Sequence, residues 1–281
     1  EYKGAYNRFS FDITDDIKSK GNVLVVGLDS TERNEIPPFG NVVDYLVYGG
    51  IYREVWIEEV SEVYIDNAFV RTLNVLQPKK VLDIDVTLSE STKGKLTFSL
   101  FDGDKKIGEK STDFSGKVIN AKWAVSDVEL WDTENPHLYT IYIRLDDSDE
   151  ISVRFGFREC RFMQDGFYLN GKKIKIRGLN RHQSYPYVGY AMPKNVQKAD
   201  ADLLKYELGV NLVRTSHYPD SIHFLDRCDE IGLLVFTEMP SWQYLGEGEW
   251  REICLDNVRR MVLRDRNHPC VILWGVRVNE G

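Results

Sequence analysis

The amino-acid sequence predicts a multi-domain chain in which β-sandwiches come first and an α/β region with parallel strands follows. Three observations lead to this prediction. Short segments rich in β-branched and aromatic residues fill the first 160 positions, and strands alternate with helical patterns after about residue 161. The composition of the 281 residues, 42% apolar and 28% charged, is that of a globular protein. At roughly 150 residues per domain, this length suggests two or three domains.

The first part of the chain contains segments with the alternation and β-branched content of strands, separated by polar, Gly, Asn and Asp turns. The predicted strands are Val23–Leu28, Tyr52–Ile57, Val81–Leu88, Lys95–Phe101, Leu138–Leu145 and Ile151–Phe157. Strands at this spacing indicate β-sandwiches. A second set of strands begins after Ser61, which indicates a domain boundary near Glu62.

A hairpin opens the second part, because Asn170-Gly171 between two apolar segments fits a two-residue type I′ turn. Strands then alternate with helices. The predicted strands are Ile174–Gly178, Asn211–Arg214, Leu233–Thr237 and Val271–Trp274, and the predicted helices are Asn195–Leu208, Ser221–Glu230 and Glu249–Arg266. Pro193, Gly209 and Gly232 are placed as helix start and stop signals. This alternation implies parallel strands joined by crossover helices.

Polar residues follow the carboxyl ends of these four strands. They are Asn180, Arg181, His182, Ser216, His217, Tyr218, Glu238, Asn279 and Glu280. In a βα barrel that end of the strands carries the chemistry. Four strands make half of an eight-stranded barrel, and an open half would leave a strand edge unpaired. We therefore expect the chain to be a fragment of a longer protein that lacks residues at both ends.

Four ordered motifs between positions 44 and 280 resemble glycoside hydrolase family 2. Asn211–Phe236 resembles the family's first signature, and Asp265–Glu280 resembles the second, which ends on the catalytic acid/base. Gly49–Val55 matches the motif that closes the family's sugar-binding sandwich, and Ile176–His182 is similar to its first barrel strand. The resemblance implies a retaining glycosidase with a glycoside or oligosaccharide substrate.

The resemblance also implies a domain plan. Residues 1–61 would form part of a jelly-roll sugar-binding domain, residues 62–158 an immunoglobulin-like β-sandwich, and residues 159–281 the first half of a (β/α)8 TIM barrel. This plan agrees with the strand-rich part and the strand–helix alternation that the residue patterns predict without it.

The acid/base is expected at Glu280. A retaining glycosidase needs one carboxylic acid that protonates the leaving oxygen and a nucleophilic carboxylate about 5–5.5 Å away. Glu280 follows an apolar strand, and burial near Trp274 would raise its pKa toward the value an acid/base needs. The resemblance implies that Asn279 binds the sugar 2-hydroxyl. It places the nucleophile outside this chain, so the 281 residues alone are expected to be inactive.

The resemblance suggests further contacts with the sugar. The expected substrate-binding residues, besides Asn279, are His217, His182, Asp44 and Asn180, and the expected supporting residues are Arg214, Glu238 and Trp274. A carboxylate such as Asp44 can accept hydrogen bonds from two neighbouring hydroxyls. Arg214 and Asn180 could instead orient the carboxylates, His217 and His182 could be ordinary loop histidines, and Asp44 could cap a turn.

The substrate is expected to be a β-galactoside, because the Asn180–His182 run is more like that of β-galactosidases than β-glucuronidases. β-Glucuronidase and β-mannosidase are the alternatives within the family. A non-catalytic carbohydrate-binding or structural role is the alternative outside it, because the nucleophile and half of the barrel are missing. No metal or other cofactor is expected, since Thr237–Trp242 has no clear counterpart of the magnesium-binding Glu/His pair of some family members.

Charge and composition restrict the partners. With 36 basic and 44 acidic residues the net charge is −8, which argues against nucleic acid or an anionic membrane as the main partner. The longest uncharged apolar runs, such as Pro269–Val276, have eight residues and cannot cross a bilayer. The four cysteines lack the spacing of a zinc site and favour a reducing, cytoplasmic compartment. The sandwich surfaces leave room for a homo-oligomer.

Overall fold

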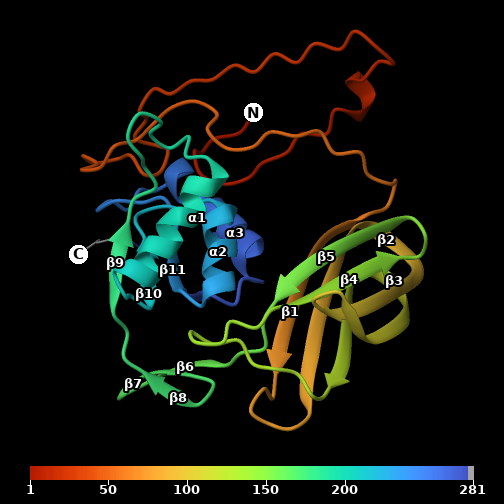
Figure 1. Cartoon of the computed structure of the whole chain (residues 1–281). Helices are drawn as coiled ribbons and strands as arrows, with labels where there is room; N and C mark the ends of the chain where they lie inside the picture. The colour runs from red at the N-terminus through yellow and green to blue at the C-terminus, as the bar shows by residue number, and fades with distance from the viewer. Residues whose placement is uncertain (278–281) are drawn as a thin grey trace.

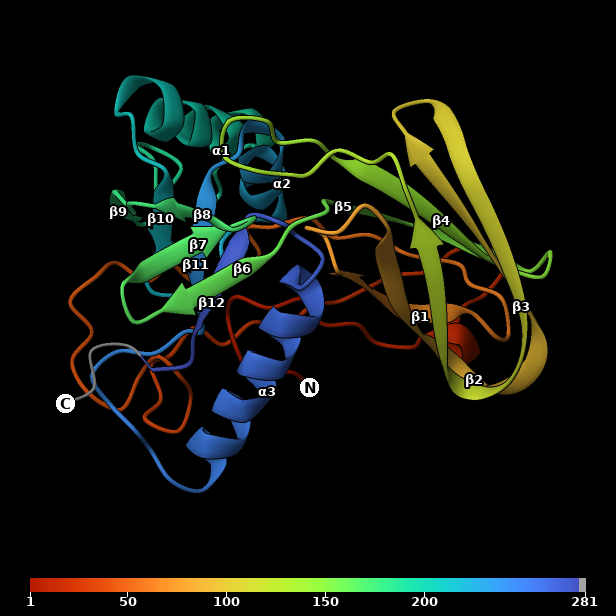
Figure 2. The same ribbon diagram turned by 90° about the horizontal axis from the view of Figure 1, so that it is seen from below.

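The computed structural model describes residues 1–277, which form a β-sandwich, a parallel α/β region and a long N-terminal segment (Figure 1). The N-terminal segment lies along the end of the α/β region toward which the β9 arrow points. A small antiparallel sheet lies across the opposite end, as the view from below shows (Figure 2). No helix in the described part of the chain is long and apolar enough to cross a membrane.

The sandwich is built from five antiparallel strands. They are β1 (Ile65–Leu73), β2 (Lys80–Asp102), β3 (Lys105–Val125), β4 (Tyr139–Leu145) and β5 (Asp149–Phe155), in the order β1-β2-β4-β5 with β3 also paired to β2. Alternate residues of these strands point inward and pack around a buried core that includes Leu82, Phe98 and Ile141. The sequence prediction missed β1 and β3.

The two strands predicted at Val81–Leu88 and Lys95–Phe101 are one continuous strand, β2. Its first half pairs with β1 and its second half with β4, and the register with β3 shifts between Thr87 and Thr92. An irregularity of this kind bends a strand. One long strand therefore contributes to both halves of the sandwich.

The small sheet contains β6 (Cys160–Met163), β7 (Gly166–Leu169) and β8 (Lys172–Ile174). Asn170 and Gly171 both have positive φ, 51° and 76°, as a type I′ turn requires, so the predicted hairpin is confirmed.

The α/β region contains four parallel strands in the order β12-β11-β10-β9. Along the chain these are β9 (Gly178–Arg181), β10 (Leu212–Thr215), β11 (Leu234–Glu238) and β12 (Val271–Gly275). The connecting helices are α1 (Lys194–Asp202), which continues as the π-helical turn η2 (Leu203–Glu207), α2 (Ile222–Ile231) and α3 (Glu249–Asp265). This confirms the predicted parallel alternation. The predicted stop signal at Gly232 is confirmed, since Gly232 ends α2 at φ 70°. The Ser221 side chain caps the start of the same helix.

The strand predicted at Ile174–Gly178 is wrong, because that segment is divided between two sheets. Ile174 pairs with Phe167 in the hairpin, whereas Gly178 pairs with Leu212 in the parallel sheet. Between them the backbone is held by the side chain of Asn211, which accepts from the Arg177 N–H at 2.8 Å and donates to the Lys175 carbonyl at 2.9 Å. The apolar pattern does not show where one sheet ends and the next begins.

The strands predicted at Val23–Leu28 and Tyr52–Ile57 are also wrong. Within residues 1–64 the structure forms one short helix, Thr14–Asp16, and no strand. Val23 and Val25 are each 85% exposed, so the segment neither pairs nor packs in the way a sandwich strand must. A β-prone sequence forms a strand only where a partner supplies hydrogen bonds and an apolar face. The assignment of residues 1–61 to a jelly-roll domain stays a prediction.

Candidate active site

The parallel sheet brings several of the predicted site residues to one edge. In its register Asn180 lies beside Arg214, Arg214 beside Phe236, and Thr237 beside Trp274. His182 directly follows β9, His217 is the second residue after β10, and Glu238 is the last residue of β11. The carboxyl ends of parallel strands lie together, so segments distant in sequence converge here.

Glu238 is the centre of a buried polar cluster. Its side chain is fully buried and accepts hydrogen bonds from Arg214 Nε on one oxygen and from His217 Nδ1, at 3.0 Å, on the other. Because a carboxylate only accepts, His217 Nδ1 is the donor in this contact, which fixes the orientation of the ring. Glu238 thus sets the orientation of two side chains at once.

Aromatic rings surround the two histidines. The Tyr45 ring, from the N-terminal segment, lies 5.4 Å from the His182 ring, 5.6 Å from the His217 ring and 6.0 Å from the Trp242 ring, between centroids. The Trp242 ring also lies 4.5 Å from the His217 ring. The sequence analysis missed Tyr45 and Trp242 as site residues, although Tyr45 directly follows Asp44.

Burial shapes the electrostatics of this aromatic group. It lowers the pKa of His182, and the neighbouring His217 lowers it further, so His182 is neutral at pH 7. Burial likewise raises the pKa of Tyr45, whose hydroxyl has no hydrogen-bond partner among the described residues. A buried hydroxyl without a partner is costly, and a ligand hydroxyl could satisfy it.

A second buried network lies directly behind the edge and was also missed. Arg181 is paired with Asp220 at 2.5 Å and with Asp200 at 2.8 Å, and its guanidinium lies over the Phe224 ring at 4.1 Å. Alternation along β9 could have revealed it, because Arg181 must point to the opposite side from Asn180 and His182. The positive charge of Arg181 is therefore neutralised by these two carboxylates inside the fold.

Arg53 joins the N-terminal segment to the same network. Its guanidinium donates to the carbonyls of Tyr6 and Pro219, each at 2.7 Å, and to Gln183 Oε1 at 3.2 Å. The Gln183 oxygen also accepts from the Ser221 N–H at 2.8 Å. These contacts hold the segment that carries Asp44 and Tyr45 against the loops after β9 and β10.

The structure places the remaining predicted residues as follows. Asp44 and Asn180 are exposed, and Trp274 is half-buried and packs against the apolar core of the α/β region. Asn279 and Glu280 lie outside the described residues. The structure therefore brings together His182, His217, Arg214 and Glu238, with Asp44 adjoining them through Tyr45.

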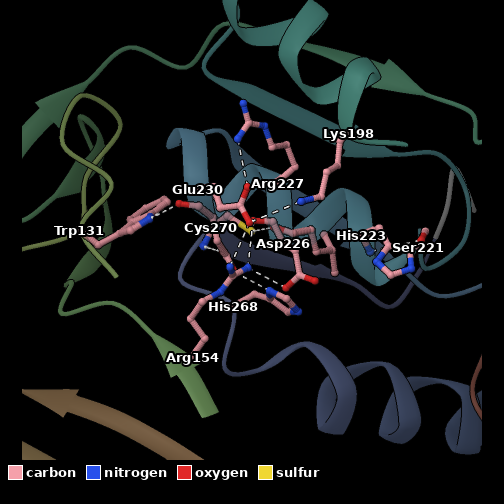
Figure 3. Close-up of polar contacts among 12 residues, drawn as sticks. Trp131, Arg154, Lys198, Ser221, His223, Asp226, Arg227, Glu230, His268 and Cys270 are labelled. Carbon is pink, nitrogen blue, oxygen red and sulfur yellow. Dashed lines mark hydrogen bonds and ion pairs between the residues drawn. The ribbon is translucent and has the colours of Figure 1, made fainter. Parts of the chain in front are cut away.

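One group of possible metal ligands exists within residues 1–277, and it lies away from this edge. Asp229, His268 and Cys270 have ligand atoms within 4.8 Å of one another, near the amino end of β12 (Figure 3). Asp229 already accepts from His268 Nδ1 at 2.5 Å and from the Cys270 N–H at 3.0 Å. These bonds account for the cluster as a structural connection between α2 and β12.

The chain thus consists of a β-sandwich followed by a parallel βα region, and a polar cluster lies at the carboxyl edge of the parallel strands. Residues 63–158 match the family described as "Glycosyl hydrolases family 2", and residues 161–281 match "Glycosyl hydrolases family 2, TIM barrel domain". The chain belongs to glycoside hydrolase family 2.

Two curated relatives and two solved structures show how far the likeness extends. The β-galactosidase of Thermoanaerobacterium thermosulfurigenes is 48% identical over 100% of this chain and 41% of its own length. That of Rhizobium meliloti is 37% identical over 99% and 38%. β-Glucuronidase 3 of Bacteroides uniformis superposes with a TM-score of 0.81 at 29% identity, covering 89% of this chain and 32% of that one. The Parabacteroides merdae β-glucuronidase gives 0.79 at 28%, covering 89% and 34%. The chain thus spans less than half of each.

Proposed function

We propose that this chain is part of a retaining β-glycosidase that removes terminal galactose from β-galactosides. The observation that carries the proposal is the convergence of His182, His217, Arg214 and Glu238 at the carboxyl edge of the parallel strands. It is supported by 48% identity, along the whole chain, to a protein named β-galactosidase.

The geometry suggests how the site holds a sugar. Glu238 holds His217 through Nδ1, so Nε2 is the ring nitrogen proposed to bond to a sugar hydroxyl. Tyr45 and Trp242 supply apolar ring surface beside it. Asp44, exposed next to Tyr45, can accept hydrogen bonds from hydroxyls. Binding and orientation of the sugar are therefore the work proposed for these residues.

The acid/base is proposed to be Glu280, with Asn279 at the sugar 2-hydroxyl, on the family resemblance of Asp265–Glu280. The nucleophile is proposed to come from outside this sequence. Protonation of the leaving oxygen by Glu280 and attack by that second carboxylate would form a glycosyl–enzyme, which water then hydrolyses.

β-Glucuronidase is the second candidate, because structural neighbours carry that name and a Formosa agariphila relative named putative β-glucuronidase is 32% identical. A uronate needs a cation in the site. Arg214 is already paired with Glu238, and Arg181 with Asp220 and Asp200. Both guanidiniums are therefore already engaged by carboxylates. β-Mannosidase ranks behind both.

Cellular location, partner and assembly are part of the proposal. No disulfide joins the four cysteines, all of which lie in the described residues, and this supports a cytoplasmic location. The acidic net charge of −8 supports a glycoside rather than nucleic acid as partner. A homo-oligomer is proposed as the assembly.

The test is hydrolysis of aryl β-galactoside, β-glucuronide, β-mannoside and β-glucoside by the product of the whole reading frame, with and without chelator. We expect preference for the galactoside and no effect of chelator. Preference for the glucuronide would keep the family and overturn the substrate. Failure to hydrolyse any of the four would favour a carbohydrate-binding role.

A further inference from the structure

The two histidines of the candidate active site lie just beyond the end of their paired strands. Among the described residues, the last backbone hydrogen bond between β9 and β10 runs from the Ser216 N–H to the Arg181 carbonyl, at 2.9 Å. His182 and His217 each come one residue after this bond, and their rings lie 5.4 Å apart between centroids. The hydrogen bonds of the sheet therefore stop short of the rings, and other contacts must set the distance between them.

Gln183 joins the two loops that carry the histidines. Its side chain is fully buried, and its Oε1 accepts from the Ser221 N–H at 2.8 Å. Its backbone N–H donates to the Tyr218 hydroxyl at 3.0 Å. Gln183 and Tyr218 are the residues directly after the two histidines, so this bond ties the loops together beside the rings.

Arg53 reaches the same amide from the N-terminal segment. Its Nη2 donates to Gln183 Oε1 at 3.2 Å and to the Pro219 carbonyl at 2.7 Å, so one nitrogen bridges the loops after β9 and β10. Its Nη1 donates to the Tyr6 carbonyl at 2.7 Å. The guanidinium thus connects three segments of the chain through neutral oxygens, at the place where the two histidine loops meet.

The two histidine rings are oriented by different means. Glu238 holds His217 through Nδ1, at 3.0 Å. Within the described part of the chain, the His182 ring has ring contacts alone, to Tyr45 and His217 at 5.4 Å and to Tyr218 at 6.1 Å between centroids. Its place depends on the backbone that carries it, and the buried Gln183 anchors that backbone at the next residue.

Loss of the Gln183 amide would have a direct consequence for the loops. Methionine has a similar length and volume, but its sulfur is a poor acceptor for the Arg53 guanidinium and the Ser221 N–H. A buried N–H without a partner is costly, so the chain would shift to recover these bonds. Such a shift would move the two histidines relative to each other.

We propose that Gln183 is a positioning residue for His182 and His217, and that Arg53 completes the same support from the N-terminal segment. Together they set the spacing of the two rings, and with it the affinity of the site for the sugar. The inference rests on the proposed function, since this spacing affects activity only if the histidines bind substrate. Because Gln183 is fully buried, it acts through the histidines and does not touch the sugar.

The test is Gln183→Met in the product of the whole reading frame, with an aryl β-galactoside as substrate. We expect kcat/KM to fall about tenfold through a rise in KM, because displaced histidines bind the sugar less well in the ground state and the transition state alike. A merely structural role would reduce the folded fraction, and so the apparent kcat, with KM at the parent value. An unchanged KM would overturn the proposal.

The matched control is Gln197→Met, the same substitution in another buried glutamine. Gln197 accepts from Arg181 Nη2 at 2.8 Å and lies in α1. Its replacement removes a bond of the same kind without untying the two loops. The control should lower the melting temperature as Gln183→Met does and leave KM unchanged. An equal rise of KM in both variants would mean general loosening of the fold and would count against Gln183.

A double-mutant cycle tests whether Gln183 acts through His182. In a His182→Ala background the ring to be positioned is gone, so Gln183→Met should cost about two- to threefold in kcat/KM, against about tenfold in the parent. The same tenfold loss in both backgrounds would show that Gln183 acts independently of this ring.

Arg53→Lys takes the place of Gln183→Met if that variant does not fold. Lysine keeps the positive charge and lacks the planar fork that reaches Tyr6 and both loops, so KM should rise here as well. An unchanged KM in this variant would again contradict the proposal.

If the parent hydrolyses no glycoside, the proposed function fails first. Crystal structures of the parent, Gln183→Met and Gln197→Met then decide the positioning role separately. A changed separation of the His182 and His217 rings in Gln183→Met alone would keep it. Identical ring positions in all three proteins would remove it.

Discussion

The two ends of the parallel sheet carry similar side chains and use them differently. At the carboxyl edge Glu238 holds Arg214 and His217, near the exposed side chains of Asp44 and Asn180. At the amino edge Asp229 holds His268 and the Cys270 backbone. A histidine paired with a buried carboxylate is therefore no sign of a functional site by itself. The Glu238 and Asp229 clusters differ in what lies around them in the fold.

At the amino edge the surroundings are another domain. The Trp131 indole donates to the Asp229 carbonyl at 2.8 Å, and Arg154 from β5 pairs with Asp226 at 2.8 Å and Glu230 at 3.1 Å (Figure 3). These contacts fasten α2 to the sandwich. At the carboxyl edge the buried Tyr45 hydroxyl has no hydrogen-bond partner among the described residues, so a ligand hydroxyl could satisfy it.

The largest effect is expected from Glu280→Gln in the complete protein. The amide cannot donate a proton to the leaving oxygen, so turnover of substrates with poor leaving groups should fall by about two to four orders of magnitude. Steady-state rates on methyl and aryl galactosides would measure this. Unchanged rates on both would remove Glu280 from the mechanism.

Glu238→Gln should affect both activity and stability. The amide cannot accept from both Arg214 and His217 as the carboxylate does, and it leaves a partly buried guanidinium unpaired. We expect about 3 kcal/mol lower free energy of unfolding, with weaker substrate binding. Urea denaturation and KM would be compared with Glu247→Gln, an exposed control. Equal behaviour of the two variants would contradict the central role of Glu238.

Asp229→Asn should affect stability alone. It weakens the bonds to His268 and to the Cys270 N–H at the domain contact, so unfolding should become easier by about 2 kcal/mol. Thermal melting and kcat/KM, with the exposed Asp104→Asn as control, measure the two effects separately. A selective loss of kcat/KM would mean that the amino edge has a functional role after all.

The smallest expected effect is on the pH dependence of folding stability. The contributions of His182, at the carboxyl edge, and His268, at the amino edge, should change with pH in opposite directions. Burial and His217 lower the pKa of His182 below its ordinary 6.5, so the unfolded chain binds a proton at His182 more readily than the folded chain. The contribution of His182 to stability is therefore lost as the pH falls below about 6.5. Burial opposes protonation of His268 too, but Asp229 outweighs it and raises the pKa. The contribution of His268 is full below 6.5 and is lost as pH rises through its folded pKa.

Stability curves of His182→Asn and His268→Asn between pH 5 and 8 would test this sign difference. His182→Asn should reduce the loss of stability at acidic pH, and His268→Asn should reduce the loss of stability at alkaline pH. Slopes of the same sign would contradict the structural difference between the edges.

The local sequence predicted the elements whose signals are short-range. The Asn170-Gly171 turn, the end of α2 at Gly232 and the strand–helix alternation from β10 to β12 all follow from neighbouring residues. The failures are elements that depend on distant partners. Val23–Leu28 has the residues of a strand and no strand beside it, and Ile174–Gly178 is divided because its two ends pair with different sheets.

The same division applies to the candidate site. The sequence by itself determined which residues follow the parallel strands, since strand alternation and the family resemblance identify His182, His217, Arg214 and Glu238. Only the tertiary structure decided that Tyr45 enters between the histidines, that Arg181 points inward to Asp220, and that Tyr48 meets the 184–189 loop. The two tyrosine contacts join segments more than a hundred residues apart, and Arg181 and Asp220 are 39 residues apart. No local pattern encodes which distant ring or charge a side chain will meet.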